Sequence, residues 1–212
     1  MPETSSPRER YRTQVRDEIK QRAREQIATA GPSALSLNAI AKLMGMSGPA
    51  LYRYYAGRDD LITELIRDAY RSLADTLRTA YDGGADLAGL ALAVREWAIA
   101  DPQRYFLMYG TPVPGYHAPD DVTEIANEIM TTLLDASGAL PTGPETAFDR
   151  HLETHRDWIG DHPAPTPVLH RALSFWTRMH GVLSLELAGH FTGMKLDPAL
   201  LFAAEVDNLL RP

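Results

Sequence analysis

The stretch SLNAIAKLMGMSGPALYRY, residues 36–54, decides the fold of this chain. It contains two short apolar-periodic runs separated by a glycine, and a serine stands directly before each run. The pattern predicts two short helices, at about 37–44 and 48–54, with Ser36 and Ser47 as their N-caps. The turn between them is too short for antiparallel packing, so the helices must cross steeply, which is the geometry of a helix-turn-helix unit.

Three further residues fit this unit. Ala41 is small at the point where the two helices approach each other, and Gly45, four residues later, is free to take the left-handed conformation that the turn requires. Leu51 follows six residues after Gly45, at the position that fills the core between the helices. No one of these residues is distinctive, but their joint spacing beside two serine caps supports the helix-turn-helix interpretation.

Segments free of glycine and proline predict longer helices on either side. Residues 8–30 carry apolar side chains at about every fourth position, which is typical of a helix face packed on a core. The breakers that follow predict further helices at about 58–81, 86–100, 101–109, 119–137, 144–159, 166–191 and 197–210. Because no run alternates with a period of two, we expect an all-α protein, with a three-helix helix-turn-helix domain at 1–57 joined by a long helix to a helical-bundle domain at 58–212.

Charge is distributed unevenly along the chain. The formal net charge is −7, but residues 1–58 hold ten Lys and Arg against five Asp and Glu, and the remainder holds eleven against twenty-three. A basic module joined to an acidic body is expected where only one end of a protein contacts the phosphates of a nucleic acid. The alternative is a basic helix face that contacts only solvent.

Composition excludes several classes of site. The chain has no cysteine, which excludes disulfides, thiolate metal sites and cysteine nucleophiles and suits a reducing compartment. No apolar run approaches the length of about 18 residues that a membrane span needs, and the first residues lack the apolar centre of a signal peptide. We therefore expect a cytoplasmic protein without a membrane partner.

No motif for catalysis stands out. The sequence has no Gly-rich phosphate loop, no serine-elbow motif and no specific carboxylate pair. His151 and His155 lie four residues apart on a predicted helix, and a metal-dependent enzyme that uses this helix is the runner-up hypothesis. Glu153 lies on a different face from these two histidines, so solvent-exposed histidines are the preferred interpretation. We expect no enzymatic activity, no metal and no cofactor.

The segment LYRYYAGRDDL, residues 51–61, is the most specific signal. It resembles the end of the recognition helix and the start of the fourth helix in the tetracycline-repressor (TetR) family of bacterial regulators, and the resemblance covers about residues 12–62. Tyr55, Gly57 and Arg58 stand where the family usually has Phe, Ser and Lys. The resemblance implies a homodimeric transcriptional regulator that responds to a ligand and binds a palindromic operator in double-stranded DNA.

Five residues are candidates for contact with the DNA backbone. The free amides at a helix N-terminus bind phosphate, so Ser36 and Ser47 are expected beside phosphates as well as in caps. The resemblance implies hydrogen bonds to the backbone from Tyr52 and Tyr54. Arg58 opens the next predicted helix, where a cation is unfavourable unless a phosphate lies close to it.

Four more residues are candidates for contact with bases. Gly48, Pro49 and Ala50 are small and stand with Arg53 on the side of the second short helix that would face the major groove. Arg53 suits a guanine edge, and Ala50 suits a thymine methyl group. With one charged side chain on this face, we expect modest direct base contact and a larger share of specificity from backbone positioning and DNA shape.

A ligand pocket is expected in the C-terminal body. Its candidate lining residues are Trp97, Tyr105, Met108, Tyr109, Trp176 and His180. The alternative is that these side chains form ordinary core. The stretch Trp176-x3-His180-Gly181 resembles a segment in the C-terminal domain of a TetR subgroup, and Gly181 in mid-helix predicts a close contact with another helix.

The last two predicted helices carry apolar residues along their length. The resemblance implies that they pair with the same helices of a second subunit in a four-helix bundle. The leading hypothesis is therefore a homodimeric repressor that a small apolar or aromatic inducer releases from its operator. A regulator whose helical body binds a protein partner is a further alternative.

Overall fold

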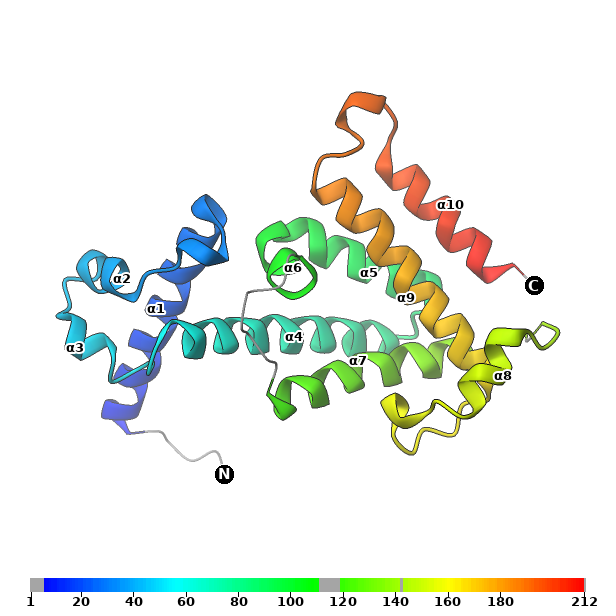
Figure 1. Ribbon diagram of the computed structural model, residues 1–212, viewed down its shortest axis with the longest axis horizontal. Helices are drawn as coiled ribbons and strands as arrows, with labels where there is room; N and C mark the ends of the chain where they lie inside the picture. The colour runs from blue at the N-terminus through cyan, green and yellow to red at the C-terminus, as the bar shows by residue number, and fades with distance from the viewer. Residues whose placement is uncertain (1–5, 111–118, 142, 212) are drawn as a thin grey trace. The chain divides into compact units, whose positions relative to one another are not determined.

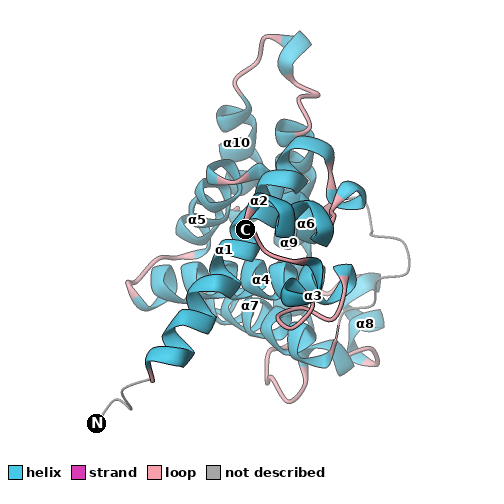
Figure 2. Cartoon of the chain, turned by 90° about the vertical axis from the view of Figure 1, so that its left-hand side faces the viewer, coloured by secondary structure: helices cyan, strands magenta, loops and turns pink. Residues whose placement is uncertain are grey.

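The computed structural model describes residues 6–110, 119–141 and 143–211. Every regular element in these ranges is a helix, so the all-α prediction is confirmed (Figure 2). The elements are α1 (Pro7–Ala30), η1 (Pro32–Ala34), α2 (Leu37–Leu43), α3 (Gly48–Leu51), α4 (Arg58–Asp82), α5 (Leu87–Ala100), α6 (Pro102–Tyr109), α7 (Asp120–Gly138), α8 (Ala147–Glu153), η2 (Asp157–Ile159), α9 (Thr166–Leu187), η3 (Thr192–Met194) and α10 (Pro198–Leu210). None of the helices within these ranges is both long and apolar enough to cross a membrane.

The chain divides into two compact units. The described part of the N-terminal unit ends at Asp68, and the C-terminal unit begins at Ala69, so the division lies within α4. The sequence places a boundary earlier, between residues 57 and 58, and that boundary stays a prediction about where the DNA-binding part ends.

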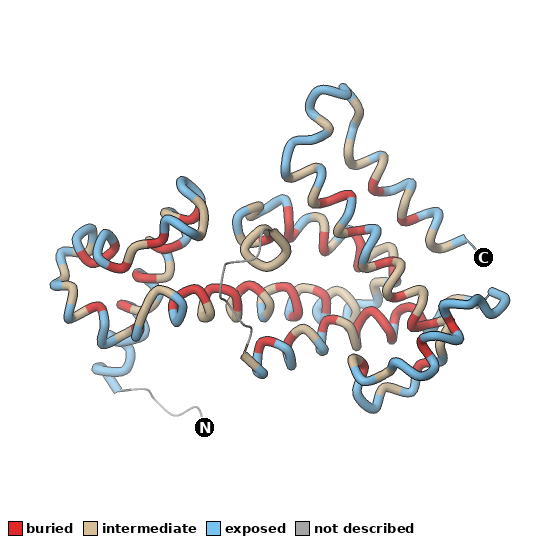
Figure 3. Tube along the Cα trace, in the orientation of Figure 1, coloured by how far each residue is buried: buried red, intermediate tan, exposed pale blue. Residues whose placement is uncertain are grey.

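The core of the N-terminal unit forms between α1, the two short helices and the first turns of α4 (Figure 3). One face of α1 is buried at every fourth residue, which is the stripe that the sequence predicts. Figure 3 shows the same regular burial along α4. The buried side chains of this core are Val15, Ile19, Ala23, Ile27, Leu35, Leu37, Ile40, Ala41, Leu51, Tyr55, Leu61, Ile62, Leu65 and Ile66.

The turn between α2 and α3 has the predicted geometry. Gly45 has a φ of 65°, which confirms its left-handed conformation. The Met46 N–H donates to the Ala41 carbonyl at 2.8 Å and the Gly45 N–H donates to the Lys42 carbonyl at 3.2 Å, the pair of bonds that defines a Schellman motif. Leu51 is fully buried in the core of the unit, as expected.

The second short helix differs from the prediction. We predicted a helix at about 48–54, but α3 ends at Leu51 and residues 52–54 form a turn. The chain tightens here because the Tyr54 N–H donates to the carbonyl of Leu51, three residues back, at 2.8 Å. The side chain of Ser47 makes no capping hydrogen bond, so its expected role as a side-chain cap is wrong.

The C-terminal unit is a bundle built on α5, α7, α9, α10 and the last turns of α4 (Figure 1). In Figure 1, α9 and α10 run side by side, and α8 lies next to α9; the packing of both pairs agrees with this view. The largest fully buried side chains in its core are Leu73, Leu77, Leu87, Tyr105, Phe175 and Phe202.

The single helix predicted at 144–159 is wrong. Two elements occupy this segment, because α8 ends at Glu153 and η2 begins only at Asp157. The carbonyl of His151 accepts from the side chains of Thr154, at 3.4 Å, and His155, at 2.8 Å. The backbone N–H of His155 turns instead to Leu152, at 3.2 Å, so the helix stops where side chains compete for its carbonyl.

The helix predicted at 166–191 ends early, at Leu187. Gly189 has a φ of 78°. The N–H groups of Gly189 and His190 donate to Glu186 and Leu185 at 2.9 and 3.0 Å, in a second Schellman motif. Gly189 is visible in the sequence. The prediction missed that the glycine closes the helix, so that α9 ends two residues before it.

Candidate functional site

Six of the nine candidate DNA-binding residues lie in α3 and the turn that follows it. Tyr52 and Arg53 are exposed, and 49% of the Tyr52 surface is accessible. Tyr54 is half-buried and Pro49 is exposed, while Gly48 and Ala50 are half-buried at the start of α3. The turn at residues 52–54 therefore presents a tyrosine and an arginine to solvent, next to a helix end with small side chains.

Ser36 caps α2, as predicted. Its Oγ accepts from the Ala39 N–H at 3.3 Å, and its own N–H donates to Oε1 of Gln26 at 3.0 Å. The second bond ties the start of α2 to α1. The Ser47 hydroxyl makes no such bond at the start of α3.

Arg58 lies at the first residue of α4 and has partners inside the protein. Its guanidinium donates to the carbonyl of Pro32 at 2.9 Å and pairs with Asp59 at 3.3 Å. These contacts fasten the start of α4 to η1. A guanidinium carries five N–H donors, so a phosphate contact would use those that point to solvent.

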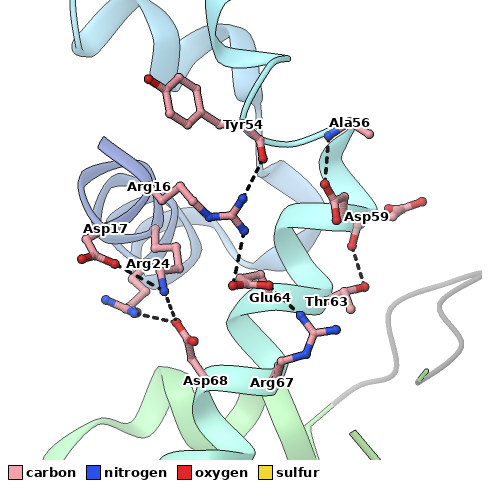
Figure 4. Close-up of polar contacts among 12 residues, drawn as sticks. Arg16, Asp17, Arg24, Tyr54, Ala56, Asp59, Thr63, Glu64, Arg67 and Asp68 are labelled. Carbon is pink, nitrogen blue, oxygen red and sulfur yellow. Dashed lines mark hydrogen bonds and ion pairs between the residues drawn. The ribbon is translucent and has the colours of Figure 1, made fainter. Parts of the chain in front are cut away.

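Arg16 is a residue that the sequence interpretation missed. From α1, its guanidinium donates to the carbonyl of Tyr54 at 3.2 Å and pairs with Glu64 of α4 at 3.4 Å (Figure 4). It also lies 4.6 Å from the centre of the Tyr55 ring. One side chain thereby joins α1, the turn after α3 and α4.

Two more cations of α1 are also paired with α4. Lys20 and Arg24 contact Asp68 at 2.9 and 3.4 Å. A signal for this face exists in the sequence, since the three cations of α1 and the two acids of α4 each repeat at intervals of four residues. The positive charge expected to face DNA is therefore partly neutralised within the unit. Among its described residues, the exposed cations are Arg8, Arg10, Arg12, Arg24, Lys42 and Arg53.

The C-terminal unit brings four of the six predicted pocket residues together. The Tyr109 ring lies between Trp176 and Tyr105, with centroids 5.6 and 5.3 Å away. The His180 ring lies 4.2 Å from Tyr109 and 4.0 Å from Trp176. We call Tyr105, Tyr109, Trp176 and His180 the aromatic cluster; it joins α6 to α9.

The hydroxyl of Tyr105 is fully hydrogen-bonded. It lies 2.9 Å from Nδ1 of His180, 2.8 Å from Oγ of Ser184 and 3.3 Å from the carbonyl oxygen of His180, and it donates its one proton to one of these three groups. These contacts fix α6 against one turn of α9.

Trp97 and Met108 lie outside the ring contacts of the aromatic cluster. The indole N–H of Trp97 donates to Oγ of Ser72 at 3.1 Å, and the guanidinium of Arg104 lies 4.3 Å from the centre of its ring. Met108 packs on the main hydrophobic core. Trp97 therefore serves the contact between α4 and α5 in this unit.

Two polar atoms of the aromatic cluster have no partner among the residues that the structure describes. They are Oη of Tyr109 and Nε2 of His180, and both are buried. Burial lowers the pKa of His180 to about 4, so its ring is neutral at physiological pH. Burial also raises the pKa of Tyr109 well above its usual value.

Gly181 does not make the close contact that we predicted. It is exposed, and a Cβ atom built on it would meet nothing within 4 Å. A larger side chain at this position would enter solvent and not the aromatic cluster. The described residues therefore make no contact that requires a glycine at this position of α9.

The described residues contain no group of three or more His, Asp or Glu side chains that is placed to hold a metal ion. His151 and His155 are exposed, and their rings stack with centroids 4.0 Å apart. Nδ1 of His155 is occupied by the carbonyl of His151. This geometry does not direct the two rings toward a shared ligand.

A separate pocket of about 160 Å³ lies near the ends of α4, α7 and α10. The sequence interpretation did not identify it. Its lining residues are Tyr81, Ala85, Asp86, Leu87, Asp135, Ala136, Ala139, Leu140 and Leu210.

Comparisons with known proteins agree with this architecture. Residues 19–65 match the family model described as bacterial regulatory proteins, tetR family, and residues 87–209 match the one described as tetracyclin repressor-like, C-terminal domain. The HTH-type transcriptional regulator Rv1816 of Mycobacterium tuberculosis is 36% identical over 216 residues, which cover 94% of this chain and 92% of the relative.

Two solved structures illustrate the range of similarity. The regulatory protein SCO4313 is 71% identical, with a TM-score of 0.92, over 98% of this chain and all of that chain. The regulator PfmR of Thermus thermophilus is only 16% identical but has the same fold, with a TM-score of 0.59 over 92% of this chain and 98% of its own. The chain therefore belongs to the tetR family and is a helix-turn-helix transcriptional regulator, not an enzyme.

Proposed function

We propose that this regulator is a homodimeric repressor that binds a palindromic operator and leaves it when a small apolar or aromatic molecule enters the aromatic cluster. The observation that carries the ligand part is the cluster itself, in which three aromatic rings surround a neutral histidine and two buried polar atoms lack partners. The stretch Trp176-x3-His180-Gly181 supports placing the chain in the subgroup that this motif defines.

For the DNA contacts, the exposed side chains around α3 support a division of roles. Arg53 is exposed, which supports its contact with a base edge, and the small residues Gly48, Pro49 and Ala50 would let α3 approach the groove closely. Tyr52 and Tyr54, the helix ends at Ser36 and Ser47, and Arg58 are the proposed backbone contacts.

For the dimer, the exposed faces of α9 and α10 support pairing through these helices. Thr177, Gly181 and Leu185 repeat at intervals of four residues on α9 and are all exposed. On α10, Leu200 is 71% exposed and Ala204 follows four residues later on the same face. Small and apolar residues in such a stripe allow a second pair of helices to approach closely.

The ligand would act through the position of α4. A dimer contacts two half-sites only when its recognition helices are separated by about 34–36 Å, one turn of DNA. The first turns of α4 belong to the unit that binds DNA, and its remaining turns belong to the unit that holds the cluster. A ligand that favours a different arrangement of α4 must bind the DNA-incompetent state more tightly, because equal affinity for both states shifts nothing.

The test is a binding footprint across the genome, followed by fluorescence anisotropy on the recovered sites. We expect inverted repeats, and we expect the purified protein to bind a full repeat with one dimer and a single half-site far more weakly. Binding to half-sites and full repeats with equal affinity would exclude the dimeric mode. If the protein only activates the genes that lie beside the recovered sites, the proposed repression is excluded.

A further inference from the structure

The polar atoms of the aromatic cluster fall into two sets. The Tyr105 hydroxyl has three partners within 3.3 Å, whereas Oη of Tyr109 and Nε2 of His180 have none in the described ranges 6–110, 119–141 and 143–211. A buried polar group without a partner is costly, so native structures rarely retain two of them on rings in direct contact. The rings of Tyr109 and His180 are in contact, with centroids 4.2 Å apart.

Among the described residues, neither of these two atoms pairs with a charged side chain. Burial is the cause of the lowered pKa of His180, and besides burial only the hydroxyls of Tyr70 and Tyr105 raise the pKa of Tyr109. An ion that paired with these two atoms would lose its hydration without gaining an opposite charge from them, which disfavours a charged ligand.

The two atoms also limit the hydrogen-bonding group that they could receive. A tyrosine hydroxyl both donates and accepts, while Nε2 of a neutral histidine does one or the other, depending on which nitrogen carries the proton. An oxygen that accepts from Tyr109 can pair with Nε2 in either case if it belongs to a hydroxyl. If Nε2 carries the proton, a carbonyl oxygen serves equally well.

We propose that the ligand of the aromatic cluster is an uncharged, mainly apolar molecule with one hydroxyl or carbonyl group, whose oxygen pairs with Oη of Tyr109 and Nε2 of His180. This inference rests on the proposed function, since it describes the molecule that would release the operator. The rings of Trp176 and Tyr105 supply the apolar walls.

Four probes that share one ring system test the proposal: naphthol, naphthalene, naphthoate and naphthylmethylammonium. Calorimetry on the full-length protein measures the affinity of each. We expect naphthol to bind about tenfold more tightly than naphthalene, the ratio that one well-formed hydrogen bond supplies, and both ions to bind more weakly than naphthalene. Equal affinities for naphthol and naphthalene, or no binding of naphthol, would overturn the proposal. Either result is expected if water alone pairs with the two buried atoms.

Two variants locate the preference. Tyr109→Phe keeps the ring and removes the hydroxyl, and His180→Phe removes Nε2; each is expected to bring the naphthol and naphthalene affinities to within about twofold. Tyr81→Phe is the matched control, because Tyr81 lines the separate pocket, and it should keep the full preference. An unchanged preference in Tyr109→Phe would contradict the proposed pairing.

Operator release is measured separately with the same probes, so the two ideas fail in different ways. Preferential binding of naphthol without release would support the ligand chemistry and contradict the proposed ligand response. If naphthoate or naphthylmethylammonium releases the operator, and does so equally well in Tyr109→Phe, the proposal of an uncharged ligand that pairs with Tyr109 is wrong. The proposal that a ligand releases the operator would still hold.

Discussion

Arg53 and Tyr52 extend into solvent from the same turn, but their chemistry suits different parts of DNA. A guanidinium forms two parallel hydrogen bonds to a guanine edge, whereas a phenol makes one bond to whichever oxygen lies nearest. The two residues follow α3 directly, and both are exposed. Sequence preference should therefore depend on Arg53 more than on its neighbour.

This division predicts a difference between two variants. Arg53→Ala should lose about 1–3 kcal/mol of binding free energy on the preferred operator and much less on unrelated DNA. Tyr52→Phe should weaken both by a similar, smaller amount, because a backbone contact is independent of sequence. Anisotropy titrations on both DNAs at one salt concentration measure this, and equal losses for Arg53→Ala would make Arg53 a backbone contact.

Asp149 is a residue whose charge matters to stability. Its side chain is 3% exposed, and its carboxylate accepts from the Thr146 N–H at 2.6 Å and from His170 at 3.0 Å. Burial raises the pKa of Asp149, but the hydrogen bonds from Thr146 and the contact with His170 outweigh it and hold the pKa below its ordinary value. The charged form is therefore favoured by folding.

A lowered pKa stabilises the fold above the unfolded-state value and ceases to do so as the pH falls through the folded-state value. At neutral pH we expect Asp149→Asn to lower the free energy of unfolding by about 1–3 kcal/mol. The gap to the wild type should shrink as the pH falls below about 4. Urea unfolding between neutral and acid pH tests this, with Asp157→Asn, an exposed carboxylate, as the control. A gap that is constant with pH would show that packing, not charge, is lost.

At the scale of helices, ends that depend on adjacent residues could be predicted and ends that depend on rotamers could not. Gly45 closes α2 through backbone bonds alone, so its identity and spacing were sufficient. The end of α8 depends on Thr154 and His155 turning toward the His151 carbonyl, and residue type does not determine that choice. The same limit explains why Ser36 caps its helix and Ser47 does not.

The two serines give a matched test of capping. Ser36→Ala removes the bond to the Ala39 N–H and should cost about 1 kcal/mol of unfolding free energy. Ser47→Ala removes no capping bond and should stay within about 0.5 kcal/mol of the wild type. Thermal unfolding of the two variants measures this. A larger loss from Ser47→Ala than from Ser36→Ala would contradict the assigned caps.

The candidate ligand site was predictable within each helix but not between helices. Tyr105 and Tyr109 on α6, and Trp176 and His180 on α9, are each four residues apart, so each pair shares a helix face. Trp97 failed as a cluster member because the packing of α5 directs its indole to Ser72. Sequence periodicity shows which residues share a face, but not which helix covers it. The contact of Arg16 with Glu64 was missed for the same reason.

At the scale of the whole molecule, the exposed Gly181 becomes informative if α9 pairs with a second copy. Gly181→Leu would place a branched side chain in the middle of the proposed interface, at a position where a Cβ atom meets no described atom within 4 Å. Because overpacking of a close helix contact costs about 1–3 kcal/mol, the dimer should dissociate at least about fivefold more readily. Operator affinity should fall with it.

Sedimentation velocity over a range of concentrations measures that change. Asn127→Leu, on an exposed position of α7, is the control for adding an apolar side chain to the surface and should leave the dimer unchanged. A Gly181→Leu protein that dimerises as the wild type does would remove Gly181 from the interface.

The division of α4 at Asp68 determines where a hybrid regulator could be joined. Grafting residues 1–57 onto the body of another family member would discard Glu64 and Asp68, and Arg16, Lys20 and Arg24 would then depend on whatever the host carries at those positions. A graft that continues through Asp68 transfers both acids together with their cations. We expect the longer graft to retain the operator preference and thermal stability of this N-terminal unit, and the shorter one to lose part of both, in a side-by-side melting and anisotropy comparison. Exchange of DNA specificity between such proteins, by design or by recombination, should therefore favour crossovers about three helical turns into α4.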